Sequence, residues 1–118
     1  MDASLARGVE LFNGGRFFAA HEVWEEIWVE CVGTEKLLLQ GLVEIAAGYA
    51  KVETGVRNGA LKLLSRGLEH LRPYLPAALG LDLTPLADGV EADVERLRAA
   101  PETAISLALV RAPVLRWV

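Results

Sequence analysis

His21 and Glu25 are the two residues whose types and spacing most clearly suggest chemistry. They lie four residues apart in a segment with the apolar periodicity of a helix, so they project one turn apart at the edge of the apolar stripe, beside Trp28. A half-buried histidine and carboxylate need partners, because an unpaired buried charge is costly. The two side chains can bind each other, a third group or a metal ion, so the spacing is compatible with both a structural pair and a working site.

The string His21-Glu22-Val23-Trp24-Glu25 is similar to the zinc-binding pattern H-E-x-x-H. In that pattern two histidines one turn apart hold zinc while the glutamate between them activates water. Here Glu25 occupies the second histidine position, so the zinc-protease pattern is incomplete. A His/Glu pair can still bind zinc, iron or manganese if a third ligand comes from elsewhere. A divalent metal therefore stays open as a cofactor.

A second pair of polar residues, Gln40 and Glu44, lies one turn apart on a segment that is otherwise apolar around most of its circumference. A short Gly33-Thr34 turn separates this segment from the one that carries His21. If the two form an antiparallel hairpin, Gln40 and Glu44 can face the same cavity as His21 and Glu25. The alternative is that Gln40 and Glu44 are only the exposed edge of a tightly packed helix.

Glutamates dominate the stretch between Arg16 and Lys36, which contains five of them and no basic residue. Glu22, Glu26 and Glu30 repeat every four residues, which favours a solvated helix face or one that pairs with a partner. The whole chain has a net charge of −4, which argues against nucleic acid or an anionic membrane as a partner.

Two further reactive side chains have ordinary interpretations. His70 lies at the boundary of an amphipathic segment with Arg66 one turn before it, which is typical of a boundary histidine. Cys31 falls on a core face without a basic neighbour to activate it, so we expect no nucleophilic role.

The periodic signals along the chain are helical, and no segment has the alternation of a strand. We expect an all-α fold, a single-domain helical bundle of four to five main helices spanning residues 1–118, with the second and third helices as a central antiparallel hairpin. Asn58 is expected to cap the fourth helix, and the apolar tail 114–118 to pack on this body or a neighbouring subunit. The expected helices cover residues 5–12, 16–32, 35–53, 59–72 and 84–99, with a short segment at 101–110 and an ordered apolar loop at 73–84.

Composition also suggests where such a protein works. One cysteine, no long apolar run and no basic-then-apolar start lead us to expect a cytoplasmic protein. Glutamine occurs once and asparagine twice, a depletion of labile residues that suits a thermophile.

Three blocks of sequence carry a resemblance to a known family. They are the run from Leu11 to Trp28 (LFNGGRFFAAHEVWEEIW), the pair Gln40-Gly41 entering an apolar helix, and the Gly-x-x-x-Gly-Ala step from Gly55 to Ala60. Over about residues 5–75 the chain resembles the domain-of-unknown-function family 309, which implies a small all-helical protein. Beyond this family-like core, we expect a helical C-terminal extension at 84–118. The resemblance implies no reaction. It places at signature positions His21, Glu22, Glu25, Trp28, Gln40 and Gly41. Glu44 departs from it, because many members have a glutamine there.

Three functions remain open at this point. The first is a binding or assembly module that contacts a protein partner or a second copy in a homo-oligomer. Its contact surface is either the apolar C-terminal tail or the face that carries Trp28 and the polar cluster of His21, Glu22, Glu25, Gln40 and Glu44. The second is a metal-dependent hydrolase that uses His21 and Glu25, with Gln40 or Glu44, as ligands and Glu22 as the base. The third is a purely structural cluster that sets the register of the helices.

Overall fold

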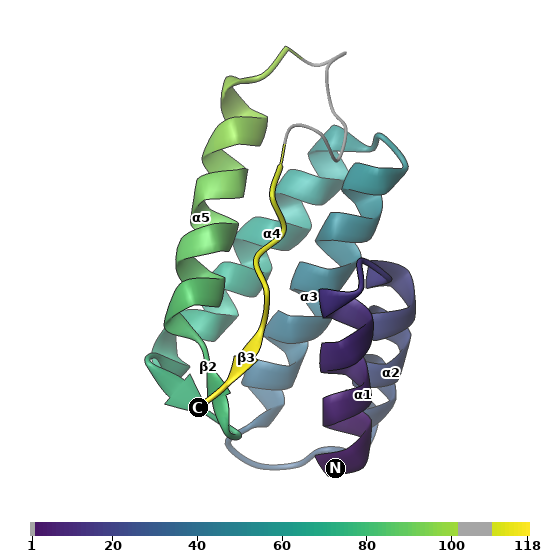
Figure 1. Cartoon of the computed structure of the whole chain (residues 1–118), viewed down its shortest axis with the longest axis vertical. Helices are drawn as coiled ribbons and strands as arrows, with labels where there is room; N and C mark the ends of the chain where they lie inside the picture. Colours follow the sequence, from purple (N-terminus) through teal and green to yellow (C-terminus); the bar gives the residue numbers. More distant parts are fainter. Residues whose placement is uncertain (1, 102–109) are drawn as a thin grey trace.

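The computed structural model describes residues 2–101 and 110–118, and the described residues form five α-helices, one short 3₁₀ turn and three short strands. Figure 1 shows α3 and α4 side by side, with α1 and α2 on one side of them and α5 on the other. The expected all-α bundle is confirmed. The helices are α1 (Asp2–Asn13), α2 (Phe17–Glu30), α3 (Lys36–Glu53), α4 (Arg57–Leu71) and α5 (Thr84–Ala99), and the 3₁₀ turn covers Arg72–Tyr74.

Several helix boundaries differ from the sequence-based expectation, including that of α1, which begins at Asp2 rather than at residue 5. The second helix ends before Cys31, which has an extended backbone (φ −75°, ψ 135°), rather than at Val32. The prediction that Asn58 caps the fourth helix is wrong, because α4 begins at Arg57 after Val56. The preceding turn decides this: Gly55 has a positive φ of 76°, and the Val56 amide donates to the carbonyl of Lys51. The fourth helix can therefore begin at Arg57, one residue before Asn58.

The expectation of no strands is wrong. Three two-residue strands, β1 (Ala77–Ala78), β2 (Leu81–Asp82) and β3 (Arg116–Trp117), form an antiparallel sheet in the order β1-β2-β3. A positive φ of 75° at Gly80 allows the tight turn between the first two. Strands this short leave no alternating pattern in the sequence, and β3 pairs with a segment more than thirty residues earlier in the chain.

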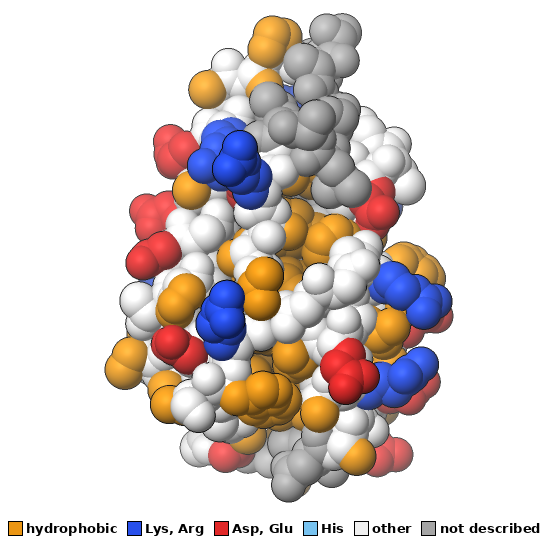
Figure 2. Space-filling view, viewed as in Figure 1, with side chains coloured by type: hydrophobic (Ala, Val, Ile, Leu, Met, Phe, Trp, Pro, Cys, Tyr) orange, Lys and Arg blue, Asp and Glu red, His pale blue; other side chains and the backbone are white. Residues whose placement is uncertain are grey.

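The C-terminal tail lies on the body of the molecule, one of the two placements expected for it. Leu115 is only 2% exposed, and the side-chain amide of Asn13 binds both the amide and the carbonyl of Leu115. The Leu115 amide donates to Asn13 Oδ1 and Asn13 Nδ2 donates to the Leu115 carbonyl, each at 2.8 Å. Figure 2 shows hydrophobic side chains gathered beside the tail, over α3 and α4. The expected segment 101–110 falls almost wholly outside the described residues.

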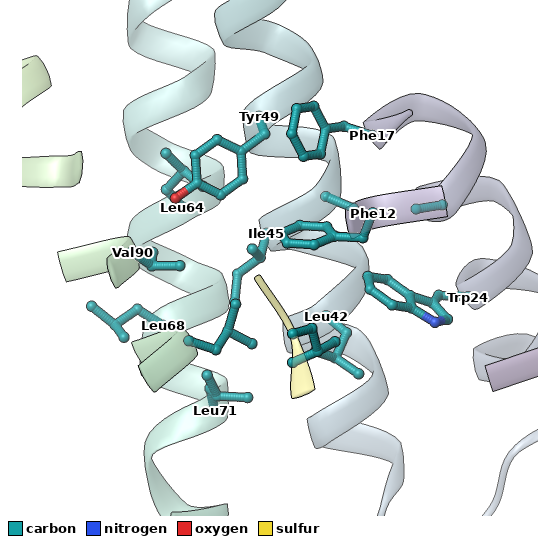
Figure 3. Packing of buried hydrophobic residues seen from close by; sticks show 14 of the residues in the cluster. Phe12, Phe17, Trp24, Leu42, Ile45, Tyr49, Leu64, Leu68, Leu71 and Val90 are labelled. Atoms are coloured by element: carbon teal, nitrogen blue, oxygen red, sulfur yellow. The ribbon is translucent and has the colours of Figure 1, made fainter. Parts of the chain in front are cut away.

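Aromatic rings join the first three helices in the core (Figure 3). The Phe12 ring centroid lies 5.8 Å from Trp24 and 5.9 Å from Tyr49, and Phe17 lies 5.3 Å from Tyr49. These contacts hold α2 against α3, and the two helices run in opposite directions. Within the described ranges, no helix combines the length and the apolar character that crossing a membrane requires.

Candidate functional site

His21 and Glu25 form the pair that their spacing predicts. The His21 Nε2 atom lies 3.0 Å from Glu25 Oε2, and Nδ1 lies 3.3 Å from the Phe18 carbonyl oxygen. The side chain of His21 is 21% exposed and that of Glu25 is 51% exposed. Both ring nitrogens thus face acceptors, so a protonated ring can donate to both and a neutral ring to only one. The pair lies at the surface, where a partner can reach it.

Trp28 occupies a different environment, at the end of α2. The ammonium group of Lys36 donates to the carbonyls of Trp28 and Cys31, at 3.0 and 3.1 Å, and lies 4.5 Å from the centroid of the Trp28 ring. The lysine thereby adds hydrogen bonds to carbonyls at the helix C-terminus, where the Trp28 carbonyl also accepts from the Cys31 amide, and makes a cation–π contact. The indole Nε1 of Trp28 is buried and has no hydrogen-bond partner among the described residues. Through Lys36, the C-terminal end of α2 is therefore bound to the start of α3.

Glu44 contacts His70 rather than sharing a cavity with His21 and Glu25 as expected. Its Oε1 atom lies 2.6 Å from Nδ1 of His70 on α4, and the Glu44 side chain is largely buried. Neither Glu44 nor the partly buried Gln40 lines the hollows that border His21. The structure therefore does not bring Glu44 and Gln40 into one cavity with His21. His70 is likewise paired with Glu44 rather than with Arg66.

Close packing of α3 and α4 explains the Glu44–His70 contact. A Cβ atom at Gly41 would lie 3.0 Å from the carbonyl oxygen of Gly67, and one at Gly67 would lie 2.8 Å from that of Gly41. Only glycine allows the two backbones to approach this closely. Gly41 within an apolar helix was the sequence signal for this contact, and Gly67 supplies its partner on α4.

A groove of about 340 Å³ lies beside His21, between the start of α2 and the end of α3. The surface of the groove is mostly apolar, and it is lined by Phe18, His21, Ala47, Ala50, Lys51, Glu53 and Thr54. A second hollow, of about 270 Å³, lies on the other side of His21. Its lining includes the carboxylates of Glu22, Glu25 and Glu26, together with Val29. His21 thus separates an apolar groove from an acidic hollow.

A metal centre needs a third ligand near His21 and Glu25. Across residues 2–101 and 110–118, no three histidine, cysteine, aspartate or glutamate side chains come together in a way that could hold a metal ion. The described residues therefore offer the two candidate ligands without a third beside them.

Sequence reasoning missed a buried polar cluster centred on Asp93 of α5, which is 0% exposed. Its carboxylate accepts hydrogen bonds from the Tyr49 hydroxyl at 2.5 Å, Arg96 Nη1 at 2.7 Å and the Arg111 amide at 2.9 Å. Burial, together with the hydrogen bond to Asp93, raises the pKa of Tyr49 far above its usual value. The cluster joins α3, α5 and the segment 110–118 that ends in the tail, and its position inside the molecule gives it a structural role.

Residues 5–63 match the family model described as Domain of unknown function (DUF309). The chain belongs to this family. The match confirms the resemblance drawn from the three blocks, and it covers most of α1, all of α2 and α3, and the first half of α4. In this DUF309 protein the matched region therefore includes His21, Glu25, the groove and the acidic hollow. A search of curated proteins finds no significant match to the chain.

Proposed function

We propose that this DUF309 protein is a non-catalytic binding module that docks a positively charged segment of another protein on the outer face of α2. The observation that carries the proposal is the composition of that face. Phe18 and Val29 are 60% and 63% exposed, and the positions between them include Glu22, Glu25 and Glu26. Exposed apolar groups surrounded by like charges are typical of surfaces that recognise a partner of opposite charge.

Exposed hydrophobic residues also lie on α2 and near its C-terminal end. Eight large hydrophobic side chains are exposed among the described residues, and four of them belong to α2, to the segment between α2 and α3, or to the first turn of α3. These four are Phe18, Val29, Val32 and Leu37. Scattered exposed hydrophobics need no explanation, but Phe18 lines the groove and Val29 borders the acidic hollow, which supports an interaction surface.

Charge favours a basic partner over a second copy of the same face. Two copies that met through α2 would place Glu22, Glu25 and Glu26 against the same residues of the other chain, and this repulsion disfavours the contact. Lysine or arginine side chains on a different protein would instead pair with these carboxylates.

The other two functions have less support. The metal-dependent hydrolase lacks a third ligand beside His21 and Glu25 among the described residues. A purely structural role fits poorly with the exposure of the pair, because exposed ion pairs contribute at most about 1 kcal/mol to stability. Replacing His21 with alanine should therefore leave the free energy of unfolding nearly unchanged. A loss of several kcal/mol would instead support a purely structural role for the pair.

Binding of a fluorescent peptide of lysine and leucine tests the proposal. The peptide has about 18 residues, long enough to form a helix on a surface. In fluorescence anisotropy at physiological salt, the double variant Glu22→Gln/Glu26→Gln should weaken binding about tenfold, equivalent to about 1.4 kcal/mol.

The matched control is Glu10→Gln/Glu69→Gln, which removes the same charge from exposed positions on α1 and α4. This variant should change the affinity less than about twofold, because solvent and salt screen charges far from the contact. Equal weakening by the two double variants, or the absence of any peptide binding, would refute the proposal.

A further inference from the structure

We infer that the segment docked on α2 is an amphipathic helix with two apolar anchors eleven residues apart, the first held in the groove between α2 and α3 and the second against Val29. This inference rests on the proposed function and specifies its partner. Between the anchors, the partner helix carries lysine or arginine toward Glu22, Glu25 and Glu26.

The spacing of the anchors follows from α2 itself. Phe18, at the groove, and Val29 are eleven residues apart in the helix. At about 100° and 1.5 Å per residue, they differ by only about 20° in direction and lie about 16 Å apart along the axis. A second helix that lies along α2 repeats this geometry when its own anchors are eleven residues apart.

The surroundings of the site favour a helix over an extended segment. An extended segment needs a strand edge to satisfy its backbone amides and carbonyls, whereas a helix satisfies its own. The nearest element on either side of this surface is a helix, α2 or α3, whose backbone groups are paired internally. The strands of the described chain involve residues 77–82 and 116–117, none of which lines the groove or the acidic hollow.

The groove has the size and lining for one large apolar side chain. Its volume of about 340 Å³ equals that of roughly ten water molecules. Ala47 and Ala50 on α3 are small, and Phe18 borders the groove from α2. A leucine, phenylalanine or tryptophan of the partner that enters it removes apolar surface of both molecules from water, which favours binding.

The charges around the groove set where the partner's basic residues lie. Lys51 and Glu53 both line the groove and are exposed, so their opposite charges offset each other and give no preference for a basic residue beside the first anchor. Glu22, Glu25 and Glu26 line the hollow that His21 separates from the groove and that Val29 also borders. Basic residues are therefore favoured between the two anchors, three or four and seven or eight positions after the first, on the same face of the partner helix.

Two peptides of identical composition test the inference. Both consist of leucine, lysine and alanine, with two leucine anchors. In one peptide the anchors are eleven residues apart, so they share a face, and in the other they are nine apart, so they lie on opposite faces. We expect the first to bind about tenfold more tightly in fluorescence anisotropy.

Variants of the groove identify where the first anchor lies. Ala47→Leu fills the groove and should abolish the difference between the two peptides, whereas Ala99→Leu at the exposed end of α5 should preserve it. Phe18→Ala removes the exposed wall of the groove without touching the core, and it should also abolish the difference. This second variant keeps the test valid if Ala47→Leu does not fold.

The results separate this inference from the proposed function. If both peptides bind equally and neither groove variant matters, while Glu22→Gln/Glu26→Gln still weakens binding, the docking function holds and the helical register is refuted. If neither peptide binds, both proposals are refuted together.

Discussion

Replacing Asp93 with alanine removes the acceptor at the centre of the buried cluster that joins α3, α5 and the segment 110–118. Asp93 is 0% exposed and accepts three hydrogen bonds, from Tyr49, Arg96 and the Arg111 amide. After the substitution, the buried hydroxyl of Tyr49 and the Arg111 amide lose their partner. Arg96 is about half exposed and can turn to water, so its loss contributes little.

The expected loss of stability follows from these groups. A buried donor without an acceptor costs about 1–3 kcal/mol, so the Tyr49 hydroxyl and the Arg111 amide together cost about 2–6 kcal/mol. We therefore expect Asp93→Ala to lower the free energy of unfolding by about 3–5 kcal/mol. In a domain of this length the melting temperature should fall by roughly 10–20 °C.

Urea titration followed by circular dichroism measures this loss. Tyr49→Phe removes only one of the three donors and should cost about 1 kcal/mol, because the carboxylate keeps its other two hydrogen bonds. The double variant should then lose less than the sum of the two single losses, since the tyrosine hydroxyl no longer needs Asp93. A loss below about 1 kcal/mol in Asp93→Ala, or strictly additive losses, would refute this account of the cluster.

Three further outcomes follow from other contacts. Burial and the hydrogen bond to Asp93 raise the pKa of Tyr49 above its unfolded value of 10.0, so only the unfolded chain releases this proton as the pH rises past 10. The free energy of unfolding should then fall by about 1.4 kcal/mol per pH unit, and Tyr49→Phe should make the decline shallower by that amount; parallel declines would contradict this. Gly67→Ala should cost about 1–3 kcal/mol in thermal unfolding because its Cβ would lie 2.6 Å from Ile45 Cγ1, and an unchanged melting temperature would show that α3 and α4 are not so close. Asn13→Ala removes both hydrogen bonds to Leu115 and should speed hydrogen exchange of the Leu115 amide about tenfold; unchanged exchange would mean that other contacts hold the tail.

The candidate site was only partly predictable. The spacing of His21 and Glu25 by one helical turn was sufficient to predict their contact, because both residues belong to one helix and no other element is needed. The placement of Glu44 was not predictable in the same way. Its direction depends on how α3 is rotated against its neighbours, and the close contact of Gly41 with Gly67 turns Glu44 toward His70 on α4.

Local patterns thus determined what lies within single helices and short turns of this protein: the all-α class, the hairpin of α2 and α3, the His21–Glu25 pair and the acidic character of α2. Tertiary packing alone decided the features that join distant segments, such as the pairing of β2 with β3 and the cluster around Asp93. The physical reason is that periodicity reports which face of one helix is apolar. It carries no information on the rotation of helices against one another or on which remote backbone group meets a buried carboxylate.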